Sequence, residues 1–371
     1  MKIYKYTIVG AGISGCSTAY ELSKHSKDIL LIDKLNSVAQ GASKAAGAFL
    51  SPLLGKPNYF KSLVTQALKH TTTLYKTNFS NAISNCGTLR IPKNDIDREK
   101  FKSYEPYHDF TYTKEDDGFF FSIGSVVSSQ AICKMMTTSF INDKNKIDTK
   151  FNYNVVKIEY KDNLWVINDE IKTEHLILST GASINYLDEP YLKIRPVWGR
   201  RIDISTSTKL NHNYHKNCSV SKSFEISSDK YQVSIGATHH RDYQDIKNSQ
   251  KDIEDLLNKA ASIIELKDIE ILKEYIGARA CSVDYIPLLG EVINSKQTIE
   301  DFPYLKHGTY VQESRFTRYK NLYILNGVGG RGFVLAPYLA KILTDFIINK
   351  KEIDTKLLTN RLFLRYIKKT K

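Results

Sequence analysis

Residues 4–15 read YKYTIVGAGISG and decide which fold to expect. The first half is a short, largely apolar strand that runs without a spacer into the glycine pattern GxGxxG, and a helical stretch follows. Each glycine then has a physical role: Gly10 permits a tight turn, Gly12 lets the backbone approach a pyrophosphate, and Gly15 lets the helix pack against the strand. The helix N-terminus favours negative charge at this turn. The pattern therefore predicts a dinucleotide-binding site.

A second apolar strand, Ile29 to Ile32, ends at Asp33. An acid at this place can accept both hydroxyls of an adenosine ribose and would repel a 2'-phosphate. The strand before, the helix after and the acid beyond all agree with a dinucleotide site. The alternative is a glycine turn in an α/β domain that binds no ligand. The cofactor-binding residues predicted from this part of the chain are Gly10, Gly12, Ser14, Gly15, Asp33 and Lys34.

Three later stretches extend this predicted site. The small residues of 41–48 let backbone lie close to a flat ligand, with a flexible surface loop as the alternative. An apolar strand, residues 175–178, stops at a small glycine-bearing turn, as a central strand bordering a ligand does. A strand from Asn321 runs into the glycines of 327–332 and then a helix, whose N-terminus would stabilise negative charge on a redox ring or bind a second anion. The cofactor-binding residues predicted here are Ala42, Ser43, Gly47, Ala48, Val156, Thr180, Gly181, Gly329, Gly330 and Gly332.

Composition bounds the class of protein. With 371 residues, 42% of them hydrophobic, the chain can bury a full core and form two domains or one elaborated domain. No apolar run approaches the ~20 residues that cross a bilayer, and the first strand is too short for a signal peptide, so we expect a cytoplasmic protein with no membrane partner. Five scattered cysteines without a CxxC pair suit reduced, packed thiols, and we expect no metal site.

The charge balance points to a partner. Lys and Arg number 53 against 40 Asp and Glu, which leaves a formal net charge of +13 and a pI near 9.2. Such an excess favours a polyanionic partner or substrate, most commonly nucleic acid. The alternative is a lysine-rich coding style biased toward A and T, because Asn, Ile, Tyr and Lys are plentiful throughout.

The three strand-to-glycine turns, at the start, middle and end of the chain, resemble those of the flavin-dependent amine oxidoreductases of the D-amino-acid oxidase and glycine oxidase superfamily. The stretches 47–52, 284–290 and 329–332, with Ala336-Pro337, narrow the resemblance. They are similar to the FAD-dependent oxidoreductase part of bacterial tRNA 5-methylaminomethyl-2-thiouridine biosynthesis bifunctional proteins, the MnmC type. The C-terminal run 360–365, followed by lysines, is similar too.

The resemblance implies an α/β fold with a discontinuous Rossmann-like FAD-binding domain and a second, α+β substrate domain on a mostly antiparallel sheet. We expect the sequence 95–118 to be irregular, 195–200 to be a link between the domains and 278–290 to be a loop. The FAD-binding domain is predicted at 1–90, 130–195 and 272–371, and the substrate domain at 91–129 and 196–271.

The resemblance also implies a reaction. The family's substrate is a tRNA wobble uridine carrying a carboxymethylaminomethyl group, which would explain the positive charge. Oxidation of this secondary amine by FAD gives an imine, and hydrolysis releases glyoxylate and leaves aminomethyl-uridine. The glycine pattern begins at residue 4, so we expect no preceding methyltransferase domain, a product that stops at the amine, and a separate methyltransferase as a partner. Two departures from the family pattern, Arg279-Ala280 for Arg-Pro and Lys44-Ala45 for Gly-Asn, affect loops near the flavin.

Two arginines are the predicted catalytic residues. Arg279 is expected to clamp the substrate carboxylate bidentately, with a salt bridge between domains as the alternative. Arg331 is expected to offset negative charge at the pyrimidine side of the flavin, with loop support as the alternative. Cys281 is close enough to Arg279 in the sequence to suggest a covalent link to the flavin. The basic candidates for tRNA phosphate contacts are Arg200, Arg201, Arg241, Arg361, Arg365, Lys368 and Lys369.

Three rival functions remain open on the sequence. A small-molecule amine oxidase of the glycine, sarcosine or D-amino-acid type would use the same flavin and the same Arg279 without RNA affinity. A non-catalytic RNA-binding flavoprotein would bind tRNA without flavin reduction. A nicotinamide dehydrogenase on a plain Rossmann fold would be colourless after purification.

Overall fold

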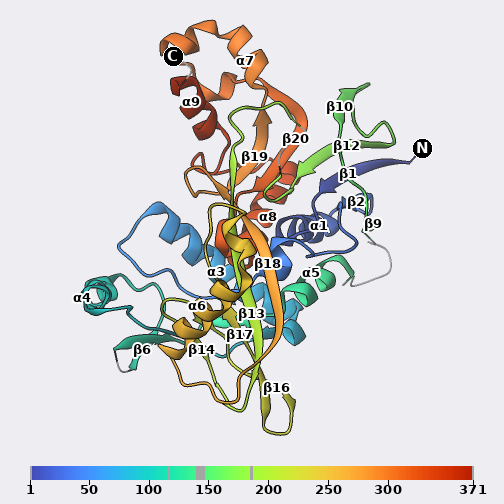
Figure 1. The fold of residues 1–371 in the computed structure, drawn as a ribbon. Coiled ribbons are helices and arrows are strands. Elements are labelled where there is room, and N and C mark those ends of the chain that lie inside the picture. The colour runs from blue at the N-terminus through green and yellow to red at the C-terminus, as the bar shows by residue number, and fades with distance from the viewer. Residues whose placement is uncertain (1, 116, 139–146, 184–186, 370–371) are drawn as a thin grey trace.

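The computed structural model describes residues 2–115, 117–138, 147–183 and 187–369. The chain builds two large sheets and passes between them several times, so neither sheet is made from one continuous segment (Figure 1). A small sheet of β3 (Phe49–Leu50), β8 (Ser125–Val127) and β4 (Ile83–Ser84) lies apart from both. This division places the N-terminal glycine turn on one sheet and most of the middle of the chain on the other.

The first sheet is parallel at its centre. β1 pairs in parallel with β2 and β12, β12 pairs in parallel with β20, and β2 pairs in parallel with β9. The antiparallel strands β10, β11 and β19 extend it. Its strands are β1 (Ile3–Val9), β2 (Ile29–Ile32), β9 (Asp148–Lys150), β10 (Ile158–Lys161), β11 (Leu164–Ile167), β12 (Ile171–Leu178), β19 (Leu288–Ile293) and β20 (Arg318–Asn326). Because their parallel members share one direction, β1, β2, β12 and β20 end at one edge of the sheet.

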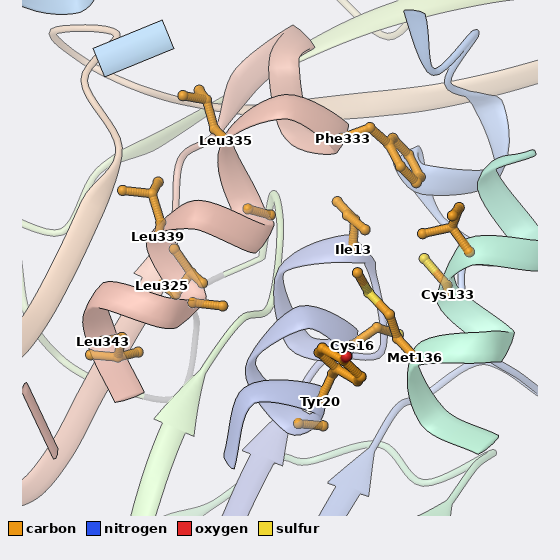
Figure 2. Packing of buried hydrophobic residues seen from close by; sticks show 14 of the residues in the cluster. Ile13, Cys16, Tyr20, Cys133, Met136, Leu325, Phe333, Leu335, Leu339 and Leu343 are labelled. Carbon is orange, nitrogen blue, oxygen red and sulfur yellow. The ribbon is translucent and has the colours of Figure 1, made fainter. Parts of the chain in front are cut away.

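Helices α1 and α8 pack together beside this sheet, and α3 and α5 extend the layer. Figure 2 shows Ile13 and Cys16 of α1 between Phe333 of α8 and Met136 of α5, all within one buried cluster. The helices of the chain are α1 (Ile13–Ser23), α2 (Ala42–Ala45), α3 (Tyr59–Asn78), α4 (Asp95–Tyr104), α5 (Ser129–Thr138), α6 (Ser249–Ala261), α7 (Ser295–Asp301), α8 (Gly332–Asn349) and α9 (Asn360–Lys369).

The helix α8 corrects one sequence expectation. Gly329–Asn349 spans 21 residues at a mean hydropathy of 1.3, so by length and composition this one helix among the described residues is long and apolar enough to cross a bilayer. In the structure it instead joins the largest buried cluster, with Leu335, Leu339 and Leu343 fully enclosed. The same features are typical of a core helix in a protein of this size.

The second sheet is mostly antiparallel, with order β18-β13-β17-β15-β14-β5-β7-β6 and β16 beside β17. The one parallel contact among these described strands joins β14 to β5. Helix α6 packs on β13 and β17 through Ile253 and Leu256. The strands are β5 (Thr88–Arg90), β6 (Tyr112–Glu115), β7 (Gly118–Phe121), β13 (Ile194–Thr206), β14 (Asn213–His215), β15 (Ser219–Val220), β16 (Phe224–Ser227), β17 (Lys230–Gly236) and β18 (Glu270–Ser282).

Three local expectations were wrong. Residues 195–200 lie inside β13 and residues 278–282 lie inside β18, because these two long strands pair along most of their length. Pro196 and Gly199 suggested a rigid link, yet both occupy paired positions, opposite Ala280 and Gly277. Within 95–118, expected to be irregular, α4 begins after the cap Asn94, whose side chain accepts from the Asp97 N–H, and β6 follows.

The C-terminal helix α9 is fastened to the loop that follows β18. Arg361 Nε donates to Asp284 Oδ2 at 2.7 Å, and the same guanidinium donates to the carbonyl oxygens of Pro287 and Leu358. The Arg361 guanidinium and the Ser282 hydroxyl hold the pKa of the Asp284 carboxyl below its usual value against the opposing effect of burial. The Arg361 guanidinium therefore makes internal contacts and is a poor candidate for a contact with a tRNA phosphate.

Candidate cofactor and substrate site

The turn between β1 and α1 is built as the glycine pattern requires. Gly10 has a φ of +106°, and a methyl group on it would lie 2.3 Å from the carbonyl oxygen of Ser179, the residue that follows the neighbouring strand β12. A methyl group on Gly15 would lie 1.7 Å from the Gly10 carbonyl oxygen. Gly12 is the N-cap of α1 and supplies no side chain to cap it. Ser14 follows as a buried residue in the first turn of the helix.

Asp33 lies at the end of β2, directly beside this turn. Its Oδ2 accepts from the Ala11 N–H at 2.6 Å and its Oδ1 accepts from the Leu35 N–H at 2.8 Å. A carboxylate has further lone pairs, so Asp33 can still accept hydroxyl protons from a sugar. Lys34, next in the chain, is exposed, and Val156 is 70% exposed with its N–H donated to Asn168 Oδ1.

The small-residue run is tied to the first turn through Ser43. Its hydroxyl accepts from the Ile13 N–H at 2.9 Å, which places α2 against the start of α1. Ala42 is exposed and Ala48 is buried with a φ of +50°. Gly47 has the Phe49 ring where a side chain would stand, 2.4 Å from a methyl group placed there. The run is therefore packed into the site and is not a free surface loop.

The other two glycine turns meet the first. Thr180 and Gly181 follow β12, and the Gly181 carbonyl oxygen accepts from Asn326 Nδ2 at the end of β20. The turn that follows β20 reaches α8 at Gly332, where a methyl group would lie 3.1 Å from Ile13 of α1. The N-termini of α1 and α8 thus face the same place. In the turn between β20 and α8, Gly329 has a φ of +58° and Gly330 is exposed.

These features fit an extended dinucleotide. The N-cap residues Gly12 and Arg331 provide no side-chain cap. Apart from the Ile13 N–H, which the Ser43 hydroxyl accepts, the first turns of α1 and α8 can therefore offer N–H groups and positive dipole ends to a pyrophosphate. The space beside Gly181 and Gly41 is open, and the buried Thr180 hydroxyl has no hydrogen-bond partner among the described residues. The individual cofactor contacts predicted from the sequence stay predictions, but the structure brings the turns that carry them together.

Arg279 lies on β18 beside the last glycine turn. Its Cδ would be 3.5 Å from a methyl group on Gly330, and its Nη1 donates to the carbonyl oxygens of Thr238 at 3.2 Å and Trp198 at 3.4 Å. Among the described residues it makes no ion pair with a carboxylate. Burial lowers its pKa. A half-buried guanidinium with only carbonyl partners is suited to receive an anion.

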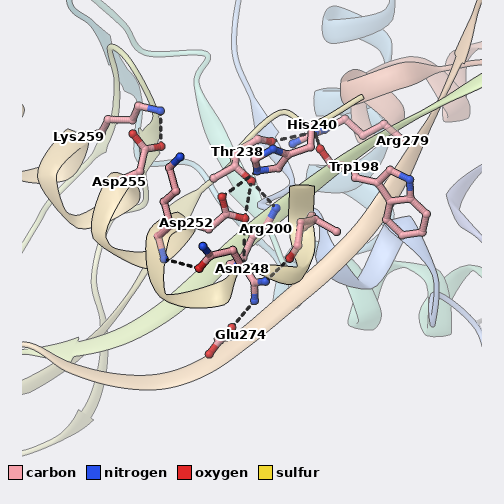
Figure 3. A network of polar contacts seen from close by, with 12 residues as sticks. Trp198, Arg200, Thr238, His240, Asn248, Asp252, Asp255, Lys259, Glu274 and Arg279 are labelled. Atoms are coloured by element: carbon pink, nitrogen blue, oxygen red, sulfur yellow. Dashed lines mark hydrogen bonds and ion pairs between the residues drawn. The ribbon is translucent and has the colours of Figure 1, made fainter. Parts of the chain in front are cut away.

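A buried polar network holds the segment that supplies these carbonyls (Figure 3). Asp252 of α6 accepts from Arg200 Nε at 3.2 Å and lies 2.8 Å from His240 Nε2, and the Thr238 hydroxyl is 3.5 Å away. Arg200 also pairs with Glu274 of β18. Arg200 is only 2% exposed, so the expectation that it contacts phosphate at the surface was wrong. It instead ties β13, α6 and β18 together around Arg279.

The remaining basic candidates divide by exposure. Arg201 is 9% exposed, bonds the Ala46 carbonyl oxygen and stacks on the Tyr275 ring, so it too is an internal group. The exposed candidates are Arg241, Arg365, Lys368 and Lys369. Cys281 is buried in β18, with its Sγ 3.5 Å from a methyl group placed on Gly329. No group of three or more His, Cys, Asp or Glu residues within the described ranges could hold a metal ion.

Arg331, in the last glycine turn, and Arg90, at the end of β5, hold neighbouring carbonyl oxygens, and the sequence identified only Arg331. Arg331 Nη1 donates to the Ser51 carbonyl oxygen at 3.1 Å, and Arg90 Nη1 donates to the next carbonyl oxygen, that of Pro52, at 2.8 Å. Burial lowers the pKa of Arg331 to about 10, and burial together with Arg331 lowers the pKa of Arg90 to about 9. Arg90 was not among the predicted site residues, because nothing local in the sequence shows that it would meet Arg331.

The sequence matches the family model described as DAO, FAD dependent oxidoreductase, over residues 5–346. This match covers more than half of the chain, so the chain belongs to this family of FAD-dependent oxidoreductases, and FAD is its cofactor. The expected resemblance to the superfamily and the expected fold class, an α/β flavoprotein with a Rossmann-like FAD-binding part, are confirmed.

Particular relatives fall into two groups. The tRNA 5-methylaminomethyl-2-thiouridine biosynthesis bifunctional protein MnmC of Legionella pneumophila (strain Corby) is 24% identical over 380 residues, covering 93% of this chain and 54% of the relative. The chain thus spans about half the length of the curated relatives it matches. Among solved structures, glycine oxidase from Bacillus cereus has a TM-score of 0.74 at 18% identity, covering 94% of this chain and 96% of that one. Glycine oxidase from Geobacillus kaustophilus has a TM-score of 0.76 at 16% identity, covering 97% and 99%.

Proposed function

We propose that this protein removes the carboxymethyl arm from 5-carboxymethylaminomethyl-(2-thio)uridine at the wobble position of tRNA, giving 5-aminomethyl-uridine and glyoxylate. The observation that carries the proposal is Arg279, a half-buried guanidinium beside the flavin-family glycine turn with no carboxylate partner among the described residues. The similarity to MnmC proteins supports tRNA as the source of the amine.

The proposed donor is a secondary amine, an N-substituted glycine. FAD, when bound, supplies a two-electron acceptor for the hydride of the glycine methylene. Loss of that hydride and of the amine proton turns the C–N single bond into an imine, and water then hydrolyses the imine to a primary amine and glyoxylate. Arg279 would clamp the carboxylate bidentately, so that the adjacent methylene has a fixed position. The carbonyl oxygens of Trp198 and Thr238 fix the guanidinium itself.

The proposal includes a division of the chain into two domains. Residues 1–90, 130–195 and 272–371 would form the FAD-binding part, and residues 91–129 and 196–271 would form the substrate part. All of β5 and parts of β13 and β18 belong to the segments assigned to the FAD-binding part, although all three strands lie in the substrate sheet. The net charge of +13 and the exposed Arg241, Arg365, Lys368 and Lys369 support contacts with RNA phosphates.

Two further parts of the proposal concern the cell. A tRNA substrate would place the protein in the cytoplasm. The product carries a primary amine, so a separate methyltransferase would be needed to give a methylaminomethyl group.

The deciding experiment is anaerobic mixing of the purified yellow protein with tRNA that carries the carboxymethylaminomethyl group, while the visible flavin absorption is followed. We expect bleaching with stoichiometric glyoxylate, and no bleaching with unmodified tRNA or free glycine. Bleaching by glycine or sarcosine but not by tRNA would instead identify a small-molecule amine oxidase. Binding of tRNA without any bleaching would identify a non-catalytic flavoprotein.

A further inference from the structure

Arg90 is a charged side chain whose position the proposed reaction does not explain. It ends β5 and donates from its Nη1 to the Pro52 carbonyl oxygen, while its buried Nε has no partner in the part of the chain that the structure describes. No carboxylate of the described residues lies within ion-pair distance of it. One hydrogen bond to a carbonyl uses only one of the N–H groups that a guanidinium carries. A side chain with a single N–H or O–H donor could hold the Pro52 carbonyl oxygen, so this contact alone does not explain an arginine at position 90.

Arg331 adds a second positive charge beside Arg90, which is electrostatically unfavourable when no anion is bound. It bonds the Ser51 carbonyl oxygen, so the two guanidinium groups hold consecutive carbonyls of one short segment. Arg331 also lowers the pKa of Arg90, as a nearby like charge does. Asp97 is the acidic group that opposes this effect, but it makes no ion pair with Arg90.

His215 shows that the surroundings do not compensate these charges. It lies opposite Arg90 in the parallel register of β14 and β5, and its Nδ1 is 2.7 Å from the Ser219 hydroxyl. Burial, followed by Arg90, Arg331 and Lys93, lowers its pKa well below the usual value, so the imidazole stays neutral. The described residues thus bring two cations together and keep a neighbouring imidazole neutral, and none of their carboxylates forms an ion pair with either arginine.

Two like charges removed from water are costly unless an opposite charge completes them. We propose that Arg90 and Arg331 form an oxyanion subsite beside the glycine turn 327–332, which takes a carboxylate or phosphate group of the substrate and is separate from Arg279. Four strands lie between β5, which carries Arg90, and β18, which carries Arg279, in the sheet order, so the two arginines come from different parts of the sheet. Only the identity of the substrate rests on the proposed function.

The test uses the FAD-loaded protein and two probes, glycolate for carboxylates and inorganic phosphate for phosphates. Binding is measured by titration of the visible flavin spectrum and by the shift of the thermal unfolding midpoint. R90M removes the charge and keeps a similar length of side chain. K93M is the matched control, because it removes one positive charge from an exposed position three residues further along the chain. We expect R90M to weaken at least one probe by about tenfold to a hundredfold, and K93M to change neither.

The pattern of losses names the source of the oxyanion. Loss of glycolate alone indicates a substrate carboxylate, loss of phosphate alone indicates a phosphate of the RNA backbone, and loss of both indicates a subsite open to either. Unchanged affinity of R90M for both probes, with equal or higher thermal stability, would overturn the proposal, because Arg90 would then be a structural charge only.

A second variant covers the case in which R90M does not fold or hold FAD. R90K keeps the charge but lacks the planar fork of donors, so it should fold and bind the affected probe several-fold more weakly. Affinity equal to that of the unaltered protein in R90K would then refute the subsite. Failure of modified tRNA to bleach the flavin would reject the proposed function and leave these probe titrations valid, so the two ideas fail independently.

Discussion

The cofactor cradle and the arginine-bearing substrate side proposed above would recognise negative charge in different ways. In the cradle, backbone N–H groups and helix N-termini would do so, and the glycines of three turns keep side chains out of the way. On the substrate side, partly buried guanidinium groups would do so, and each is positioned by carbonyl oxygens of segments distant in the sequence. The difference teaches that the first turn of the cradle is encoded in a dozen consecutive residues, whereas the arginine sites exist only once the sheet has formed.

The largest effect is expected from Gly15→Ala, which tests the cradle. The new methyl group would meet the Gly10 carbonyl oxygen at 1.7 Å, so the turn and α1 must separate. We expect a loss of about 3 kcal/mol or more in the free energy of unfolding, together with loss of bound FAD. Urea unfolding and the ratio of flavin to protein absorbance measure both.

Gly41→Ala is the matched control for that change. Gly41 lies in the same site, has no left-handed backbone and has nothing within 4 Å of an added methyl group. Its stability should stay within about 0.5 kcal/mol of the unaltered protein. Equal damage from both substitutions would show that the cradle does not depend on the close packing of its first turn.

Asp252→Ala tests the substrate side, and its effect should be nearly as large. It leaves Arg200 buried with one carboxylate, Glu274, and it frees the segment that holds Thr238. We expect about 3 kcal/mol of destabilisation and a raised KM for the amine substrate, because Arg279 loses a fixed partner. Asp255→Ala is the control: this acid is on the same helix and pairs with Lys259 at a partly exposed site. A similar loss in both variants would assign the effect to α6 as a whole.

Arg279→Leu separates the two regions directly. The substitution should raise the KM for carboxymethylaminomethyl-tRNA by about a hundredfold, since a charge-assisted bidentate contact is lost, while FAD stays bound. Arg195→Leu, an exposed arginine on the neighbouring strand β13, serves as the control. Release of FAD before any change in KM would mean that Arg279 belongs to the cradle instead.

The smallest expected effect is a pH dependence of the free energy of unfolding that originates at His175, in strand β12 of the first sheet. His175 stacks between Tyr6 and Tyr323, and burial, with Lys350 and Lys5, lowers its pKa to about 4. The unfolded chain protonates His175 more readily than the folded chain does. The contribution of the neutral imidazole to the free energy of unfolding is therefore fully present above the ordinary histidine pKa, and it declines as the pH falls toward 4. After allowance for partial exposure we expect about 1 kcal/mol between pH 7 and pH 5. His175→Gln should remove that part of the slope in urea unfolding, and an unchanged slope would contradict it.

The same contrast explains which features the sequence predicted. Gly10, Gly12 and Gly15 with Asp33 have a fixed spacing and a local cause, so both the turn and its place beside β2 could be predicted. The convergence of the turns at Thr180 and Gly330 followed from family resemblance. Arg90 could not be predicted, because its only relevant neighbour, Arg331, lies far along the chain and no short-range pattern couples them.

The strands around Arg279 were misread for a related reason. Proline and glycine normally mark turns or strand ends, and Pro196 and Gly199 therefore suggested a break, although Gly277 is also a glycine within the paired strands. In the structure β13 and β18 pair through all three positions, so cross-strand pairing outweighs local propensity. The irregular stretch after Ile91 was misread because α4 depends on the cap at Asn94, a weak signal in a charged sequence.

The contact between Gly332 and Ile13 has a consequence for biosynthesis. The starts of α1 and α8 lie more than 300 residues apart in the sequence, so during translation the first is made long before the second. A nascent chain on the ribosome carries an unfinished pocket with exposed apolar strands, a state prone to aggregation. We therefore expect tight capture of flavin only after residue 332 has left the ribosome, and a shortage of the vitamin precursor should reduce the maturation of new chains.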